Sequence, residues 1–264
     1  MQVRRFRATL EDDGTEYYGF QRQAKHRTVQ AEVEAAIGRV CNVDRVVVSC
    51  AGRTDSGVHA RGQVIAFNAE WRHCLSDLLR AINAHLPSDA SVVALDYAED
   101  GFDPRRAARW RRYEYNIYNA PVRSPLYARM SWRVWPELDL DAMQVGSDFL
   151  IGEHDFACFG RAPEKGGHTI RTVREAKWRA EGLFLNFTVE ANAYLYHMVR
   201  SIVGALRLVG TGRWNADMMN EVLKSKDRGR CVVLAPPQGL VLTCLLYTSP
   251  SPRDRQKSRM PSSA

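Results

Sequence analysis

Residues 45–68 read RVVVSCAGRTDSGVHARGQVIAFN, which places a glycine-rich loop between two apolar runs. The runs RVVVSC (45–50) and QVIAFN (63–68) are rich in β-branched and aromatic side chains, which is typical of strands. Three glycines in residues 51–62 permit tight turns and the close approach of another backbone. We therefore expect a sheet that presents this loop at its edge.

Asp55 is the candidate catalytic group of this loop, two residues after Arg53 and four before His59. A neighbouring arginine keeps a carboxylate ionised and lowers its pKa, as a nucleophile working near neutral pH requires. The residues alone leave a structural alternative open, in which Asp55 caps a turn and Arg53 is its solvated partner.

Outward from the loop, strands and helices follow in the same order in both halves of the chain. Apolar periodicity predicts strands at 2–10, 45–50, 63–68, 91–97, 109–118, 172–180, 183–190 and 239–246. It predicts helices after Thr28, which would cap the first of them, and at 75–86, 139–150, 193–209 and 216–224.

Each half thus reads strand, helix, strand, strand, helix, strand, with one extra helix in the second. This is the split-βαβ plan of ferredoxin-like and RRM-like domains, in which helices cover one face of an antiparallel sheet. We predict an α+β fold with an N-terminal α/β domain (1–104), a C-terminal α/β domain (105–247) and an active-site cleft between them. Residues 248–264 are rich in Ser, Pro and Arg, so we expect a disordered tail that need not be native sequence.

The composition is that of a globular protein, with 45% apolar and 25% charged residues among 264. No apolar run approaches the roughly 18 residues of a membrane span, and no signal peptide is evident, so we expect a cytoplasmic protein. The six cysteines are scattered without metal-ligand spacing, and we expect reduced thiols and no metal. Of the net charge of +7, the tail supplies three units, which leaves a mildly basic body compatible with a polyanionic partner.

Residues 104–115 interleave five arginines with three aromatic residues where a cleft between the halves would form. Arginines contact phosphates without regard to sequence, and aromatic rings stack on unpaired bases, so the segment favours RNA contact. The alternative is a solvated strand edge whose aromatic residues point into the core.

The helix expected at 193–209 carries a polar stripe of Tyr196, Arg200 and Arg207. Solvation is favoured for Arg207, whereas the role of Arg200 stays open.

The loop AGRTDSGVHA with the following GQVIAF resembles the signature of the tRNA pseudouridine synthase A family. Further stretches resemble that family in the same order: DDGTEYYGFQRQ (12–23), RRYEYNIYN (111–119), GEHDFACF (152–159), NAYLYHMVRSIVGAL (192–206), SKDR (225–228) and GLVL (239–242). The resemblance covers residues 3–245. It departs at Asp12, Phe20 and Ser56, where the family usually has an aromatic residue, Trp and often Lys.

The resemblance implies an isomerase that converts uridines 38, 39 and 40 of the tRNA anticodon stem-loop to pseudouridine. Asp55 falls on the family's catalytic aspartate, acting either at the ribose C1′ or on a C2′ proton. Tyr113 would stack on the uracil and Leu240 would lie beneath the ring. Arg53 would hold Asp55 ionised and fill the gap left by the extruded base, and Arg200 would pair with Asp55 from the other half.

The reaction involves no oxidation and no net group transfer, so no cofactor is expected, and the chain has no phosphate-cradling glycine loop or dinucleotide motif. The resemblance also implies a homodimer that binds one tRNA across both subunits. The basic segments 21–27 and 104–112 would then hold phosphates through Arg22, Lys25, Arg105, Arg106 and Arg109.

Two other functions compete with this interpretation. Residues 11–15 (EDDGT) approximate the D-x-D-G-T motif of a haloacid dehalogenase-type phosphotransferase, but Glu11 replaces its nucleophilic aspartate and no second set of Mg²⁺ carboxylates is evident. A non-catalytic RNA-binding module could share the predicted fold. The set Arg53, Asp55 and Tyr113 favours an enzyme, because a pure binder does not need it.

Overall fold

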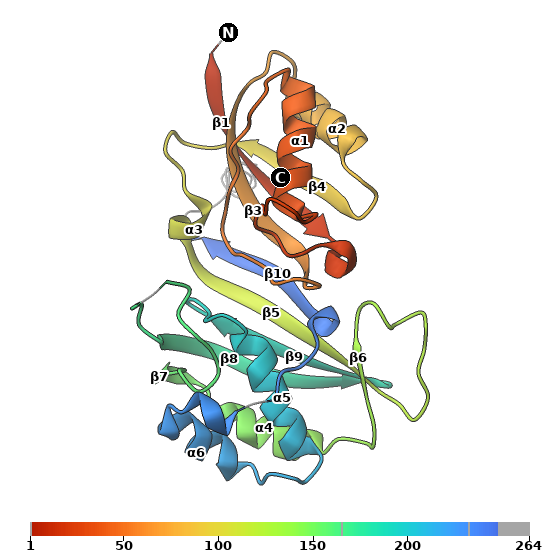
Figure 1. Cartoon of the computed structure of the whole chain (residues 1–264), viewed down its shortest axis with the longest axis vertical. Helices are drawn as coiled ribbons and strands as arrows, with labels where there is room; N and C mark the ends of the chain where they lie inside the picture. Colours follow the sequence, from red (N-terminus) through yellow and green to blue (C-terminus); the bar gives the residue numbers. More distant parts are fainter. Residues whose placement is uncertain (1, 165, 232, 248–264) are drawn as a thin grey trace, which may run out of the picture.

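The computed structural model describes residues 2–164, 166–231 and 233–247, and within them the chain forms one extended sheet with helices packed against it (Figure 1). The strands are β1 (Val3–Asp12), β2 (Ser49–Cys50), β3 (His59–Glu70), β4 (Ala90–Tyr97), β5 (Ala108–Asn119), β6 (Trp132–Val134), β7 (Gly152–Asp155), β8 (Ile170–Glu181), β9 (Phe184–Ala191) and β10 (Leu240–Tyr247). The helices are α1 (Val29–Cys41), α2 (Leu75–His85), α3 (Pro104–Ala107), α4 (Leu140–Asp148), α5 (Met198–Gly210) and α6 (Asp217–Ser225). Short 3-10 turns are η1 (Gly14–Glu16), η2 (Arg228–Arg230) and η3 (Pro237–Gly239).

The N-terminal half is built on β1, which pairs antiparallel with β3 on one side and with β4 on the other. Alternate residues of β1 are buried, including Phe6, whose ring stacks on Phe67 of β3 at a centroid distance of 5.3 Å. Helices α1 and α2 bury their apolar stripes in the same core, as periodicity predicts. Thr28 does precede α1, but its side chain makes no capping hydrogen bond.

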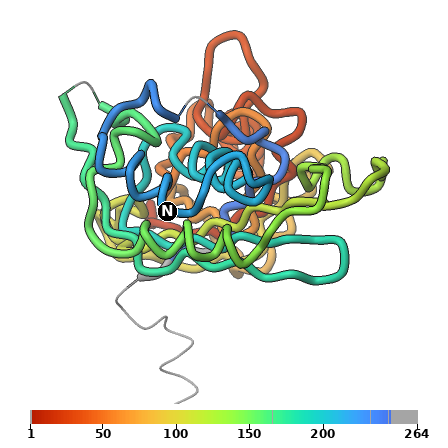
Figure 2. The backbone as a smooth tube through the Cα atoms, turned by 90° about the horizontal axis from the view of Figure 1, so that it is seen from below, coloured from red at the N-terminus to blue at the C-terminus, as the bar shows by residue number. Residues whose placement is uncertain are grey.

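The C-terminal half is an antiparallel arrangement of β5, β9, β8 and β7, with the short β6 running parallel to β5. Helix α5 is its core element and is buried along almost its whole length, while α4 packs against it and α6 packs against α4. Seen from below, the blue helices α5 and α6 lie on one side of the teal strands β8 and β9 (Figure 2). The predicted α+β class, with helices packed against antiparallel strands, is confirmed.

The last strand joins the two halves into a single sheet. β10 pairs antiparallel with β5 and parallel with β3, where Val241 lies opposite His59. The sheet order is therefore β4-β1-β3-β10-β5-β9-β8-β7, with β2 beside β3 and β6 beside β5. The parallel pairing was not predicted, and it fixes the start of β3, directly after the Asp55 loop, against the other half.

The prediction of a strand at 45–50 is wrong over most of that range. Only its last two residues form a strand, the short β2, which pairs with β3. Val46 and Val48 are buried nonetheless, and the Val48 N–H donates to the Glu34 carboxylate of α1 at 3.0 Å rather than to a strand. A side chain from a distant helix thus satisfies the backbone that a strand partner would have satisfied.

The helix predicted at 193–209 begins five residues later, at Met198. His197 has a left-handed backbone (φ 64°), and Tyr196 pairs with Arg161 in an isolated bridge, so the segment before α5 cannot be helical. Tyr196 is consequently not on a helical stripe with Arg200.

The division of the chain at residue 104 stays a prediction, and the tail predicted at 248–264 lies outside the described residues. Over the described ranges, the helices are too short or too polar to cross a membrane.

Candidate active site

The loop between β2 and β3 is shaped by its own hydrogen bonds. The Val58 N–H donates to the Asp55 carbonyl at 3.1 Å, and Gly57 in this turn has a left-handed φ of 75°, which favours glycine. At the start of the loop, the Gly52 N–H donates to the side chain of the buried Gln63 at 3.2 Å. Both ends of the loop are therefore anchored, and Asp55 is held at its apex.

A second segment, residues 17–20, packs on the same loop. The Phe20 N–H donates to the Thr54 carbonyl at 3.1 Å, and the Gly57 N–H donates to the Tyr17 carbonyl at 3.2 Å. Gly19 has a φ of 83°, and a Cβ there would lie 2.6 Å from the Thr54 carbonyl oxygen. The sequence needs glycine at this position because the two backbones approach too closely for any side chain.

The Asp55 carboxylate extends from the loop toward the start of α5, and its side chain is 18% exposed. Its Oδ2 is 3.7 Å from His197 Nε2 and 3.8 Å from Arg200 Nη1. Burial raises the pKa of Asp55, and the charges of His197 and Arg200 oppose that rise. Arg200 is itself held in place, because its Nε donates to the Ala235 carbonyl at 2.8 Å.

Arg53 does not have the electrostatic role that the sequence suggested. Within the described chain, the ion pairs of Asp55 are those to His197 and Arg200, and the pKa of Asp55 is raised rather than lowered. Arg53 is exposed to solvent, and its charge acts instead on the thiol of Cys50. Arg53 is close to Asp55 in the sequence, but the fold places Arg200, from the other half of the chain, beside the Asp55 carboxylate.

Tyr113 lies on β5 beside the loop and is 8% exposed. A Cβ on Gly52 would lie 3.9 Å from its hydroxyl oxygen, and the ring of Tyr194 packs edge-on against its ring at 5.0 Å. Burial, then the charge of Asp55, raise the pKa of Tyr113, so its hydroxyl stays protonated. Leu240 begins β10 and is buried opposite Tyr115. The structure therefore brings Asp55, Arg200 and Tyr113 together at the junction of the halves.

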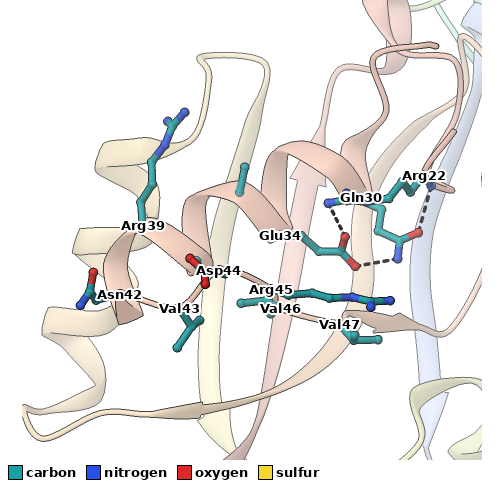
Figure 3. A pocket seen from close by; sticks show the side chains of 12 residues that line it. Arg22, Gln30, Glu34, Arg39, Asn42, Val43, Asp44, Arg45, Val46 and Val47 are labelled. Atoms are coloured by element: carbon teal, nitrogen blue, oxygen red, sulfur yellow. Dashed lines mark hydrogen bonds and ion pairs between the residues drawn. The ribbon is translucent and has the colours of Figure 1, made fainter. Parts of the chain in front are cut away.

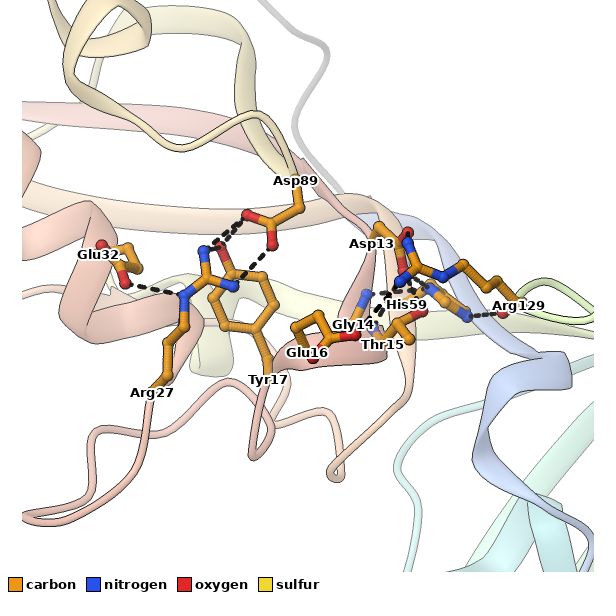
Figure 4. A network of polar contacts seen from close by, with 10 residues as sticks. All are labelled: Asp13, Gly14, Thr15, Glu16, Tyr17, Arg27, Glu32, His59, Asp89 and Arg129. Carbon is orange, nitrogen blue, oxygen red and sulfur yellow. Dashed lines mark hydrogen bonds and ion pairs between the residues drawn. The ribbon is translucent and has the colours of Figure 1, made fainter.

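His59, at the start of β3, connects three segments of the chain (Figure 4). The Gly14 N–H donates to its Nδ1 at 2.9 Å, so Nδ1 carries no proton. Its Nε2 then donates to the carbonyls of Arg129 at 2.9 Å and Gln238 at 3.1 Å. Because this ring is 1% exposed, we regard it as a structural joint between the halves. Neither His59 nor His197 was predicted as a site residue, although both lie inside the family motifs quoted above.

Arg27 belongs to the basic segment 21–27, yet it is occupied within the protein. Its guanidinium donates to the Asp89 carboxylate at 2.7 Å and to Glu32 at 3.1 Å, and Asp89 also accepts from the Tyr17 hydroxyl at 2.7 Å (Figure 4). These contacts tie the segment that leads into α1 to the residues before β4. Arg27 therefore holds the loop, whereas Arg22 and Lys25 of the same segment are exposed.

The Arg-rich segment divides in the same way. Arg105, Arg106 and Arg109 are exposed. Arg111 instead donates to the carbonyl of Asn192 at 2.7 Å, and Arg112 donates to the buried Glu190 at 3.0 Å. The segment thus presents three cations outward and uses two to hold β5 in place.

A hollow of about 640 Å³ lies in the N-terminal half between α1 and residues 42–47 (Figure 3). Arg22 lies at its edge, where it forms an ion pair with Glu34 at 2.6 Å. The hollow does not include Asp55. Among the described residues, no group of three or more His, Cys, Asp and Glu side chains is arranged to hold a metal ion.

Comparison with known proteins identifies the family of the chain. A sequence model of the family described as tRNA pseudouridine synthase matches residues 8–103 and 148–248. The tRNA pseudouridine synthase A of Myxococcus xanthus is 41% identical over 97% of this chain and 95% of its own length. That of Colwellia psychrerythraea is 37% identical over 97% of this chain and 98% of its own length. A solved Cbf5-Nop10-Gar1 complex aligns over 76% of this chain and 45% of its own, with 16% identity and a TM-score of 0.34, too low to argue from.

Matches of this extent, over a fold with a partly buried carboxylate at the junction of its halves, define an isomerase that acts on tRNA. The chain belongs to the tRNA pseudouridine synthase family, and the relatives above carry the designation A. Membership of this family rules out the phosphotransferase alternative. In the segment that suggested it, the Asp12 side chain is buried away from solvent, and Asp13 accepts a hydrogen bond from the Thr15 backbone.

Proposed function

We propose that Asp55 is the catalytic carboxylate and that the substrates are uridines 38, 39 and 40 of the tRNA anticodon stem-loop. The observation that carries the proposal is the position of Asp55, which is mostly buried and faces Arg200 and His197 from the other half of the chain. Burial raises the pKa of Asp55, which makes it a stronger base and nucleophile than an exposed carboxylate. The charge of Arg200 opposes this rise and favours the ionised form.

The proposed reaction begins with the target uridine out of its stack, at a cost of a few kcal/mol. Asp55 then attacks C1′ or removes a proton from C2′, and the C1′–N1 bond breaks. The uracil rotates and C5 bonds to C1′, while the bond from Asp55 to C1′ breaks or, on the other route, Asp55 returns its proton to C2′. C5 then loses its proton and N1 gains one, so atoms balance without a cofactor. Tyr113 and Leu240 would contact the uracil ring, because both lie at the junction beside the loop. Arg53 is exposed and could enter the space the base vacates.

Phosphate contacts would come from Arg22, Lys25, Arg105, Arg106 and Arg109, since all five side chains are exposed. We further propose a cytoplasmic homodimer that binds one tRNA across both subunits, an expectation that rests on family resemblance alone. The mildly basic body of the chain suits a polyanionic partner.

The test is to incubate an unmodified tRNA transcript with the wild type, with Asp55→Asn and with Asp77→Asn, and to map pseudouridine at each nucleotide. Asp77 lies on α2 and serves as the control for removing a carboxylate from the N-terminal half. We expect pseudouridine at positions 38–40 with the wild type and the control, and none with Asp55→Asn. Activity retained by Asp55→Asn would overturn the catalytic assignment. Modification at other positions would overturn the substrate assignment, and RNA binding by a wild type without turnover would favour the binding-module alternative.

A further inference from the structure

His197 has a backbone conformation that is unusual for its place in the fold. Asn42, His197 and Lys226 are the non-glycine residues with positive φ in the described chain. Asn42 and Lys226 follow the C-termini of α1 and α6, where a left-handed residue commonly ends a helix. His197 instead precedes the N-terminus of α5, with φ 64° and ψ 8°. This conformation costs a residue that has a Cβ roughly 1 kcal/mol.

Helix capping does not explain this conformation. The His197 side chain makes no capping hydrogen bond to α5, although its carbonyl accepts the Ser201 N–H at 3.0 Å as the helix begins. The left-handed turn instead places the imidazole against the Tyr196 ring, at a centroid distance of 4.0 Å, with Nε2 3.7 Å from Asp55 Oδ2. The ring is 26% exposed, so it lies in the same partly buried space as the carboxylate.

The charged groups around His197 come from four elements of the chain. They are Asp55 of the loop, Arg200 of α5, Arg228 of η2 and Arg161 of the segment after β7. Burial lowers the pKa of His197, the charge of Asp55 raises it, and the three arginines lower it. Arg200 is permanently charged, whereas His197 is the neighbour of Asp55 whose charge can change near physiological pH.

We propose that His197 is a positioning residue for the reaction, whose imidazole orients the Asp55 carboxylate and, when protonated, keeps it ionised. The inference rests on the proposed catalytic role of Asp55. Arg200 and His197 both approach Oδ2, which leaves Oδ1 as the oxygen for the ribose. The fixed charge and the titratable charge therefore act on the same oxygen. Their joint effect is to extend the pH range over which Asp55 is ionised toward the acid side.

The experiment measures kcat/KM on tRNA from pH 5 to pH 9 for the wild type, His197→Asn and His197→Gly. Both replacements accept a left-handed backbone, so the fold is kept while the imidazole is removed. We expect kcat/KM at pH 8 within about threefold of the wild type. A unit charge 3.7 Å away, at the dielectric of water, corresponds to about 0.8 pH unit, so the acid limb of the kcat/KM profile should move to higher pH by about that much where His197 is protonated in the wild type.

On the acid limb the two variants should therefore lose up to about sixfold more activity than they lose at pH 8. Thermal melting checks that the variants are folded. An acid limb that coincides with that of the wild type, or a loss that is uniform across pH, overturns the role of His197. Asp55→Asn, assayed in parallel, separates the two proposals. If it is inactive while the His197 variants show no shift, only this inference fails, whereas activity in Asp55→Asn removes the proposed function.

Discussion

Asp12 is the residue whose replacement should stabilise the protein most clearly. It ends β1, is 4% exposed, and lies opposite Ala60 of β3 and Ala90 of β4. Both carboxylate oxygens lack a hydrogen-bond partner among the described residues. Burial, then the charges of neighbouring carboxylates, first that of Asp13, raise the pKa of Asp12 to about 7.

The magnitude follows from the difference between the folded and unfolded pKa. A pKa of about 7 in place of 3.8 corresponds to about 4 kcal/mol of unfolding free energy, an upper limit for a group that can gain water. The fold favours the protonated form, so the stabilisation is fully present below pH about 4 and is lost as the pH rises through about 7. Asp12→Asn removes this pH dependence, and we expect its free energy of unfolding to exceed that of the wild type by about 2–4 kcal/mol at pH 8.5.

Urea unfolding followed by tryptophan fluorescence at pH 5 and pH 8.5 measures this difference. At pH 5 the advantage of Asp12→Asn should shrink to at most about 1.6 kcal/mol, because the folded Asp12 is still protonated there and only the unfolded aspartate, with its pKa of 3.8, has ionised. Glu11→Gln, which removes an exposed neighbouring charge, is the control and should change stability by less than about 0.5 kcal/mol. The reasoning is refuted if Asp12→Asn changes stability by the same amount at both pH values.

Much of the fold was predictable because local periodicity and tertiary packing use the same side chains. The helix predicted at 75–86 is α2, and the strand predicted at 183–190 is β9. The failures occurred where distant contacts determine the backbone. Glu34 satisfies Val48 in place of a strand partner, and the chain before α5 pairs with Arg161 instead of continuing the helix.

The site was predictable to a similar extent. Asp55 could be found because the glycines around it and the carboxylate itself lie in one short segment. Its neighbours His197 and Arg200 could not be found from spacing, because they lie at and just before the start of α5 in the other half, and the parallel pairing of β10 with β3 brings the halves together. Arg200 was indicated by family resemblance, whereas His197 was missed. The available signal was a histidine three residues before Arg200 in the same motif.

The remaining predictions concern the support of the Asp55 loop and the contact with RNA. Gly19→Ala should destabilise the fold by about 1–3 kcal/mol more than Gly101→Ala in urea unfolding, because both glycines have positive φ but only Gly19 lacks space for a Cβ. Equal losses would show that the backbone contact can relax. Replacing Arg105, Arg106 and Arg109 together by Ala should weaken tRNA binding and lower the slope of log K against log salt by about 2–3, since each phosphate contact releases about one counterion. Arg80→Ala, on the exposed face of α2, should leave that slope unchanged. The same slope in the triple variant and the wild type would remove these arginines from the interface, since an arginine that neutralises a phosphate cannot be lost without lowering the salt dependence.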